Sequence, residues 1–324
     1  MKRDDATFSC GICRGGQSSA TYEAREMMFG LRTRFHYEQC ARCGTLWLTD
    51  PPQDYSPYYP EDYYSFENSS GGAKRRIRAY LRAKRDLAYF QQRALFGRIL
   101  ARRYQDSALL AVSKLHARKG ARILDVGCGS GSLLRRMAAI GFRNLAGVDP
   151  FLSKDVSYGA NVKIRKCKLG DLIGEKYDVV MFHHSLEHME NPLAVLQVAA
   201  ELMAPGGSCL VRMPVVAYAW EKYGTNWVQL DPPRHMWLPT DNAMKALARS
   251  AGLHMKRLEY DSTEFQFWGS ELYVRDVPFA AVAQGKLTSY FHKSEISKFR
   301  EEARALNRNG RGDSAMFVLS VELG

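Results

Sequence analysis

Short apolar segments alternate with longer helix-like stretches through the second half of the chain. The runs at residues 123–126, 145–149, 162–165 and 177–182 have the length and composition of strands that are buried on both faces of a parallel sheet. Residues 208–214, 254–260 and 315–321 are further strand candidates, and we expect the last two to pair antiparallel. This alternation predicts an α/β fold with a doubly wound sheet.

The first strand leads into a glycine-rich turn, Gly127-Cys128-Gly129-Ser130-Gly131, with Asp125 directly before it. Glycines lack Cβ atoms, so a ligand can lie almost on the backbone of such a turn. Dinucleotide-binding folds use a related turn in which the third glycine comes one residue later. Asp125 is placed to meet a cationic ligand, and Asp149 at the end of the next strand can accept both hydroxyls of a ribose.

With these motifs in this order, residues 119–261 and the final strand resemble the class I S-adenosylmethionine-dependent methyltransferases. The resemblance implies a seven-stranded Rossmann-like sheet and S-adenosylmethionine as cofactor. In that family the acid matching Asp125 lies near the methionine amino group, the acid matching Asp149 binds the ribose, and the acid matching Asp171 receives the adenine amino group. The cofactor-binding residues are therefore expected to be Asp125, Gly127, Cys128, Gly129, Gly131, Asp149, Pro150, Asp171, Leu172 and His183.

Histidines and glutamates crowd the loop after the strand at 177–182. Ligands of open α/β sheets bind beyond the carboxyl ends of the strands, so this loop is expected to lie beside the methyl donor. Histidine is a common general base near neutral pH. We expect His184 and His188 to be the leading base candidates, with Glu187 as orienter or second base. His235 and its neighbour Arg234, in a long aromatic loop after the strand at 208–214, are further candidates.

Two other interpretations of this loop stay open. Its acid and histidines can simply fix the loop conformation. The stretch also resembles the polyprenyl-quinone O-methyltransferases, where the positions matching His184, Glu187 and His188 carry acids and a histidine linked to a divalent cation. Here the first of the three is a histidine rather than an acid.

The N-terminal region contains two Cys-x-x-Cys pairs, Cys10/Cys13 and Cys40/Cys43. Two such pairs can supply four thiolates to one tetrahedral zinc ion, which would have a structural role because no coordination position stays open. Two disulfides or incidental thiols are the alternatives. Methyltransferases of bacterial polysaccharide and sugar-modification clusters look similar here, with a two-knuckle module followed by a tyrosine-rich stretch and the cofactor fold.

A strongly basic helical segment, residues 74–103, precedes the cofactor fold and supplies most of the formal net charge of +12. An anionic membrane surface, a diphosphate-bearing substrate and nucleic acid all suit such charge, and a solvated covering helix is the alternative. No apolar run approaches the ~18 residues that span a bilayer, and no signal peptide is evident. We therefore expect a cytoplasmic protein. Residues 74–103 are the segment through which it could contact a membrane surface peripherally.

These patterns predict three regions in a chain of 324 residues. Residues 1–64 form a zinc-ribbon-like module with a tyrosine-rich tail, 65–118 a basic helical linker or lid, and 119–324 the cofactor-binding domain, with an insertion at 262–310. The expected function is methyl transfer to a sugar or glycan-linked small molecule, on oxygen before carbon, with a nucleotide- or lipid-linked sugar as acceptor. The alternatives are an RNA base methyltransferase, although no Asn-Pro-Pro-Tyr-type motif follows the fourth strand, and a non-catalytic cofactor-binding interaction module.

Overall fold

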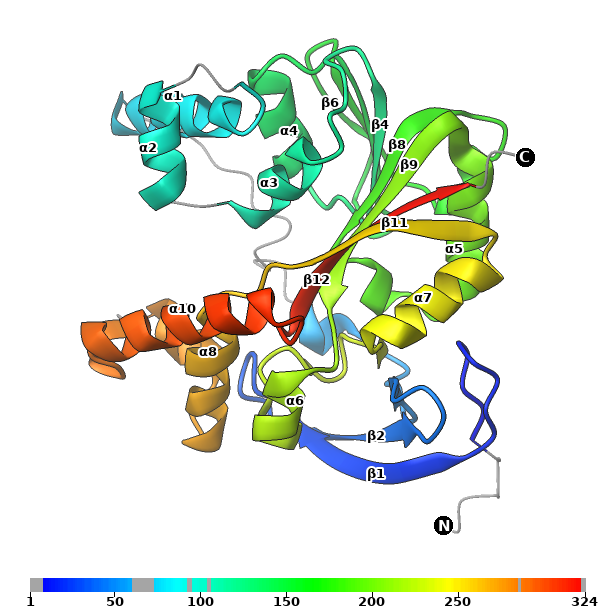
Figure 1. The fold of residues 1–324 in the computed structure, drawn as a ribbon, viewed down its shortest axis with the longest axis vertical. Coiled ribbons are helices and arrows are strands. Elements are labelled where there is room, and N and C mark those ends of the chain that lie inside the picture. The colour runs from blue at the N-terminus through cyan, green and yellow to red at the C-terminus, as the bar shows by residue number, and fades with distance from the viewer. Residues whose placement is uncertain (1–7, 60–72, 92–94, 104–105, 285–286, 322–324) are drawn as a thin grey trace.

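The computed structural model describes residues 8–59, 73–91, 95–103, 106–284 and 287–321. Its centre is an eight-stranded sheet with the order β11-β12-β9-β8-β4-β5-β7-β6 (Figure 1). The strands are β4 (Arg122–Val126), β5 (Asn144–Val148), β6 (Val156–Tyr158), β7 (Val162–Arg165), β8 (Tyr177–His183), β9 (Met203–Pro214), β11 (Leu253–Tyr260) and β12 (Ser314–Val321). All seven predicted strands are present, and the predicted antiparallel pairing of β11 with β12 is confirmed.

The expectation of seven strands is wrong by one. The additional strand, β6, pairs antiparallel with β7 at the edge of the sheet. It is only three residues long, and none of the three is fully buried. Its sequence therefore carries neither the apolar run nor the strict alternation by which a strand is recognised.

Alternate residues of the central strands pack into different cores, as expected for a sheet covered on both faces. Leu124 and Val126 of β4 join the core beneath α5 (Pro192–Leu202) and α7 (Asp241–Ser250). Ile123 of the same strand joins the core beneath α3 (Ser107–Ser113) and α4 (Ser132–Ala139). Asn191 caps α5 by accepting the backbone N–H of Ala194 at 3.1 Å, as its position before Pro192 predicts.

The N-terminal region, residues 8–59, is called the cysteine module below. It holds the hairpin β1 (Ser18–Arg25) and β2 (Arg34–Cys40) followed by β3 (Leu46–Leu48). A fourth strand, β10 (Trp237–Leu238), pairs with β3 although it comes from the far side of β9 in the chain. The module is therefore completed by a strand of the cofactor-binding domain, to which it lies adjacent in Figure 1.

Two helices, α1 (Ala73–Ala88) and α2 (Leu95–Arg103), form the basic segment and lie beside α4 (Figure 1). They pack closely, because a Cβ atom on Gly97 would lie 2.2 Å from the carbonyl oxygen of Lys84. Asp86 of α1 is buried and forms ion pairs with Arg85 and with Arg136 of α4. A buried carboxylate needs such partners, so Asp86 fixes the basic segment against the sheet domain.

The long aromatic stretch after β9 and the insertion at 262–310 contain more helix than the sequence indicated. The stretch begins with α6 (Tyr218–Tyr223), and the insertion consists of α8 (Phe265–Val274), α9 (Phe279–Gln284) and α10 (Lys293–Arg308). Short 3₁₀ helices lie at Ser56–Tyr58, Leu169–Leu172, Leu186–His188, Gly224–Asn226 and Leu287–Ser289. Among the described residues no helix combines the length and apolar character that crossing a membrane demands.

Candidate functional site

The glycine-rich turn joins β4 to α4 and has the close backbone packing that its sequence predicts. Gly127 has a φ of 72°, and a Cβ atom there would lie 2.6 Å from Cβ of Ser185. At Gly131, with a φ of 75°, a Cβ atom would lie 2.1 Å from Cδ1 of Ile164. Both positions thus require glycine for conformation and for space.

The two acids beside this turn are buried and differ in their surroundings. Asp149 accepts the backbone N–H of Gly129 at 2.9 Å and that of Phe151 at 3.0 Å. Burial and the nearby charge of Asp149 raise the pKa of Asp125 to about 8. A cation placed beside such a buried carboxyl stabilises its ionised form and lowers its pKa.

The remaining predicted cofactor residues lie around the carboxyl ends of the same strands. Asp171 is exposed and accepts the backbone N–H of Lys168 at 2.8 Å, whereas Leu172 is buried. Pro150, the second residue after the end of β5, is exposed. Two neighbours that sequence reasoning missed, Phe151 and Ile173, leave 84% and 61% of their surface exposed, which is unusual for such apolar side chains.

His183 ends β8 and is the predicted cofactor residue with the least satisfied side chain. Both of its ring nitrogens are buried, and neither has a hydrogen-bond partner among the described residues. Burial, together with the charges of Arg212 and His184, lowers the pKa of His183 to about 3. The ring is therefore neutral, and one nitrogen can donate while the other accepts.

Glu187 is the centre of the predicted catalytic cluster and is completely buried. Its Oε1 lies 3.3 Å from Nδ1 of His184 and 3.9 Å from Nε2 of His235, but within the described chain neither carboxylate oxygen accepts a hydrogen bond. Burial alone would raise the pKa of Glu187, yet the three histidines around it hold the pKa at about 2. The carboxylate of Glu187 is thus ionised when a histidine beside it carries a proton.

The hydrogen bonds of His184 fix its tautomer. The Arg212 guanidinium donates to Nε2 of His184 and also pairs with Asp261 at 2.5 Å. A guanidinium has no acceptor, so the lone pair of Nε2 is engaged and Nδ1 carries the proton that faces Glu187. This arrangement suits an orienting residue better than a proton acceptor.

The two other histidines of the cluster have the opposite arrangement. Nδ1 of His188 lies 2.7 Å from the carbonyl oxygen of Arg234, and Nδ1 of His235 lies 2.8 Å from that of Gln229. A carbonyl only accepts, so each Nδ1 carries a proton and each Nε2 keeps a lone pair. Burial and the charge of His235 lower the pKa of His188, so His188 is neutral and able to accept a proton at neutral pH.

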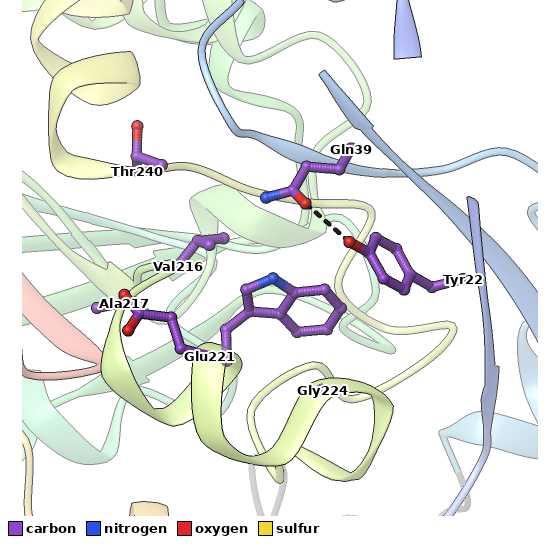
Figure 2. A pocket seen from close by; sticks show the side chains of 8 residues that line it. Tyr22, Gln39, Val216, Ala217, Glu221, Gly224 and Thr240 are labelled. Atoms are coloured by element: carbon purple, nitrogen blue, oxygen red, sulfur yellow. Dashed lines mark hydrogen bonds between the residues drawn. The ribbon is translucent and has the colours of Figure 1, made fainter. Parts of the chain in front are cut away.

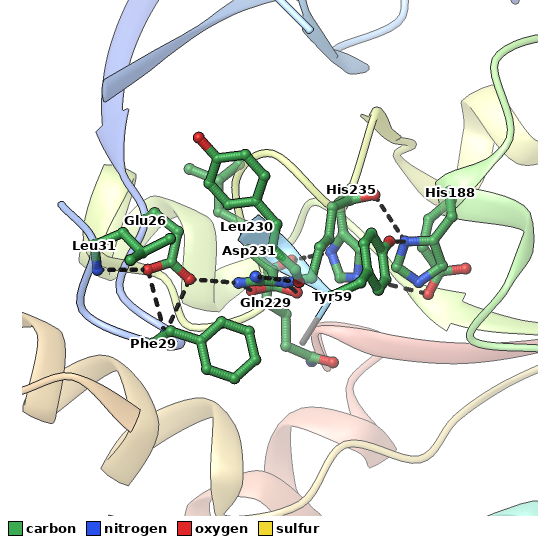
Figure 3. A network of polar contacts seen from close by, with 12 residues as sticks. Glu26, Phe29, Leu31, Tyr59, His188, Gln229, Leu230, Asp231 and His235 are labelled. Atoms are coloured by element: carbon green, nitrogen blue, oxygen red, sulfur yellow. Dashed lines mark hydrogen bonds and ion pairs between the residues drawn. The ribbon is translucent and has the colours of Figure 1, made fainter. Parts of the chain in front are cut away.

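His235 reaches the cluster from residues 229–237, called the proline loop below because it contains the cis Pro232–Pro233 peptide. Its ring centroid lies 4.9 Å from that of His188. The hydroxyl oxygen of Tyr59, a residue of the cysteine module, lies 3.4 Å from Nδ1 of His188 (Figure 3). The structure thus brings together His184, Glu187, His188 and His235, all four predicted catalytic residues. One ligand atom each of Glu187, His188 and His235 lies within 4.8 Å of the others, a spacing that can hold a divalent cation.

Arg234 is buried in the same loop, and sequence reasoning did not reveal its role. Its guanidinium pairs with Glu26 at 2.9 Å and with Asp231 at 2.5 Å, and it donates to the carbonyl oxygen of Tyr58 at 3.2 Å. Both Arg234 and Glu26 have fully buried side chains. The sequence signals are an acid and a base three residues apart, Asp231 and Arg234, on either side of two prolines.

The four cysteines of the module converge. Sγ of Cys10 lies 3.5 Å from that of Cys43, Sγ of Cys13 lies 3.4 Å from that of Cys40, and all four lie within 4.8 Å of one another. Four thiolates bound to zinc at about 2.3 Å are roughly 3.8 Å apart, whereas a disulfide needs about 2.0 Å. The cluster therefore fits a tetrahedral zinc site and does not have disulfide geometry.

A separate open cavity of about 560 Å³ lies between the cysteine module and α6 (Figure 2). Tyr22 and Gln39, whose side chains are hydrogen-bonded to each other at 3.0 Å, form its module side. The lining residues are Tyr22, Gln39, Val216, Ala217, Trp220, Glu221, Gly224 and Thr240. None of the predicted cofactor or catalytic residues is among them.

Comparison with known proteins finds O-methyltransferases among the proteins to which this chain is similar. The chain is 34% identical over 153 residues to a ubiquinone biosynthesis O-methyltransferase of Cereibacter sphaeroides, covering 42% of this chain and 61% of that protein. It is 35% identical over 122 residues to a protein of the same name from Xanthomonas euvesicatoria, covering 34% of this chain and 51% of the relative. This chain thus spans between half and two thirds of the length of these relatives.

Among solved structures, a cyclopropane synthase from Mycobacterium tuberculosis aligns with a TM-score of 0.42 and 18% identity, over 65% of this chain and 81% of that one. The family described as "Methyltransferase domain" matches residues 96–258, which is half of the chain. That range includes the glycine-rich turn, Asp125, Asp149 and the loop with His184, Glu187 and His188. The chain belongs to the methyltransferase-domain family.

Proposed function

We propose that the protein transfers a methyl group from S-adenosylmethionine to a hydroxyl oxygen of its acceptor, with His188 as general base. The observation that carries this proposal is the tautomer of His188. Its Nδ1 donates to the carbonyl oxygen of Arg234 at 2.7 Å, so Nε2 keeps the lone pair that a base needs. Its lowered pKa keeps that lone pair free at neutral pH.

The neighbouring residues support His188. Glu187 would be ionised beside the imidazolium that forms when His188 takes a proton, and would stabilise it. His184, held by Arg212, directs its Nδ1 proton toward Glu187. His235 stands beside His188 and is a second acceptor of the proton.

The cofactor would lie along the glycine-rich turn. Asp125 would meet the cationic methionine end and Asp149 the ribose, with Gly127, Cys128, Gly129 and Gly131 forming the floor, and with Pro150, Asp171, Leu172 and His183 completing the site. Bound there, S-adenosylmethionine supplies an electrophilic methyl group whose leaving group is a neutral thioether. The residues of the protein then have to orient the acceptor and remove its proton. The exposed apolar side chains of Phe151 and Ile173 suit the faces of an adenine ring.

Cys10, Cys13, Cys40 and Cys43 would hold one zinc ion in the cysteine module. Four protein thiolates leave no coordination position open, so this ion would stabilise the module and take no part in methyl transfer.

For the acceptor we propose a sugar or glycan-linked small molecule, in nucleotide- or lipid-linked form. The cationic helices α1 and α2 support this choice, because arginine side chains suit the oxygens of a diphosphate. A polyprenyl-linked aromatic ring is the second candidate, favoured by the name of the relatives from Cereibacter and Xanthomonas. Methylation of an RNA base is a third outcome of the test below.

The test uses S-adenosylmethionine with a labelled methyl group. The purified protein is offered nucleotide sugars, lipid-linked sugars, polyprenyl-substituted phenols and bulk RNA, and the labelled product is identified by mass spectrometry. His188→Ala should slow product formation by about a hundredfold or more, whereas His116→Asn, at an exposed residue with a φ of 51°, is the matched control that should not. Label on RNA alone would overturn the proposed acceptor. Transfer by the His188→Ala variant at the rate of the unaltered protein would overturn the proposed base.

A further inference from the structure

We propose that the cysteine module is a positioning part of the active site, because it holds the proline loop and thereby sets the tautomer of His188. This inference rests on the proposed function only in that it concerns the base of the proposed reaction. The coupling runs through Arg234, because its side chain contacts the cysteine module and its backbone contacts the catalytic cluster.

The side chain of Arg234 belongs to the interface with the module. Its Nη2 donates to Glu26 at 2.9 Å, and its Nη1 donates to the carbonyl oxygen of Tyr58 at 3.2 Å. The remaining pairing is to Asp231 of its own loop. With Arg234 only 1% exposed and bonded on three sides, its guanidinium is committed to structure and is closed to an acceptor molecule.

The backbone of the same residue belongs to the catalytic cluster. The carbonyl oxygen of Arg234 accepts the Nδ1 proton of His188 at 2.7 Å. At the next residue, the carbonyl oxygen of His235 accepts the hydroxyl proton of Tyr37, a buried residue of the module, at 2.6 Å. A shift of the loop relative to the module therefore moves the carbonyl that keeps the proton on Nδ1 of His188.

Glu26 is itself rigidly placed, which makes it a firm anchor. Its carboxylate accepts the backbone N–H groups of Phe29 and Leu31, both at 3.0 Å, in the turn between β1 and β2 (Figure 3). A carboxylate that accepts several N–H groups and one guanidinium has little freedom to move.

A second set of contacts fixes the C-terminal end of the proline loop. Trp237 pairs with Trp47 across β10 and β3, and the two indole rings stack with centroids 5.9 Å apart. The indole N–H of Trp237 also donates to the carbonyl oxygens of Leu186 and Met189, which flank Glu187 and His188. The loop that carries His235 is thus held by the module at Arg234, His235 and Trp237.

The test reads the tautomer directly and does not need the acceptor. The chain has eight histidines, so ¹⁵N-histidine labelling gives a resolvable set of ring signals, with His188 assigned by comparison with His188→Gln. We compare the unaltered protein with Glu26→Gln and Tyr37→Phe. The matched control is Tyr22→Phe, which removes a module hydroxyl whose hydrogen-bond partner within the described chain is Gln39.

We expect the unaltered protein and Tyr22→Phe to hold His188 with its proton on Nδ1. In Glu26→Gln and Tyr37→Phe the ratio of the Nδ1–H to the Nε2–H form of His188 should fall about fivefold or more. This is the change expected when Nδ1 of His188 loses its hydrogen bond to the carbonyl oxygen of Arg234. S-adenosylmethionine affinity, measured by calorimetry, should stay unchanged in all three. If Glu26→Gln does not fold, the isosteric Tyr37→Phe decides.

An unchanged His188 tautomer in folded Tyr37→Phe and in any folded Glu26→Gln protein would overturn the coupling. Failure of the proposed function has a different signature, because it removes methyl transfer in the unaltered protein and leaves the tautomer measurement intact. Once an acceptor is identified, Glu26→Gln and Tyr37→Phe should lower kcat and leave the KM for S-adenosylmethionine unchanged, as expected of positioning residues.

Discussion

The hydroxyl of Thr240 donates to the carbonyl oxygen of Cys43 at 2.9 Å. The same hydroxyl oxygen accepts the backbone N–H of Ala243 and so caps the start of α7. One side chain therefore connects a cysteine of the cluster to a helix that covers the central sheet. Loss of order around Cys43 reaches the methyltransferase domain directly through this contact.

The first prediction concerns the metal. Elemental analysis of the protein purified under reducing conditions should find about one zinc per chain, and Cys40→Ser should lose it and melt at a lower temperature. Binding of S-adenosylmethionine should persist, because its expected residues lie on the other sheet. The control is Cys209→Ser, at a cysteine outside the cluster, which should keep the zinc. A folded protein without metal would contradict the assignment.

The second prediction concerns Asp149. Asp149→Ala should weaken S-adenosylmethionine binding by about ten- to a hundredfold, since charge-assisted hydrogen bonds to two ribose hydroxyls are worth roughly 1.5–3 kcal/mol. Calorimetry measures this directly. The variant also loses the bonds to Gly129 and Phe151, so a melting curve must accompany each titration. Unchanged affinity in a folded variant would refute the ribose assignment.

The third prediction concerns Asp125. Its folded-state pKa of about 8 lies above the value of about 4 expected in the unfolded chain. The folded protein therefore binds this proton more tightly, and its contribution to stability decreases as pH rises from about 4 to about 8. Asp125→Asn should remove that decrease and raise the melting temperature at pH 8, while weakening S-adenosylmethionine binding.

Thermal melts of Asp125→Asn at pH 5 and pH 8 test the first half, and calorimetry tests the second. A melting temperature at pH 8 that falls below that of the unaltered protein would show that Asp125 already has a stabilising partner in the free protein.

The fourth prediction concerns the base. His188→Ala should lower turnover by about a hundred- to ten-thousandfold without changing cofactor affinity. Because the pKa of His188 is lowered by burial and by His235, activity should be lost only as the pH falls below the ordinary histidine value of about 6.5. Loss of activity on chelation, restored by magnesium, would instead indicate a catalytic cation at Glu187, His188 and His235.

The fifth prediction concerns the basic helices. Arg82 of α1 and Arg98 of α2 are exposed, so their combined replacement by Ala should raise the KM for a diphosphate-linked acceptor more than it lowers kcat. The effect should shrink at high salt, since exposed charges are screened. Arg249→Ala combined with Lys256→Ala, two exposed cations near the opposite edge, is the control. An uncharged sugar that performs equally well would argue against this role.

Much of the fold could be predicted because its signals are local. β4 and β8 are apolar runs, the glycine-rich turn precedes α4 where its sequence places it, and Asn191-Pro192 begins α5. β6 and β10 could not be predicted, because strands of three and two residues are too short to carry a recognisable pattern. β10 also owes its pairing to β3, which lies far earlier in the chain. The tyrosine-rich tail was predicted through residue 64, but positions 60–64 lie outside the described residues.

The candidate site shows the same division. The crowding of His184, Glu187 and His188 is visible in the sequence because they share one loop. The role of Arg234 is not visible, because a buried guanidinium is recognised only by its partners, and Glu26 and Tyr58 lie far away in the chain. Tautomers likewise depend on which carbonyl faces each ring, a property that only tertiary structure supplies.

The borrowed strand β10 also determines the order of assembly during synthesis. The cysteine pairs leave the ribosome before the methyltransferase domain, and residues 10–43 contain all four cysteines of the cluster. The sheet that contains β3 cannot close until Trp237 and Leu238 have emerged, after most of the methyltransferase domain. Contacts so distant in sequence form late because of their loop-closure entropy. The nascent module therefore keeps an open edge at β3 until Trp237 and Leu238 have been synthesised.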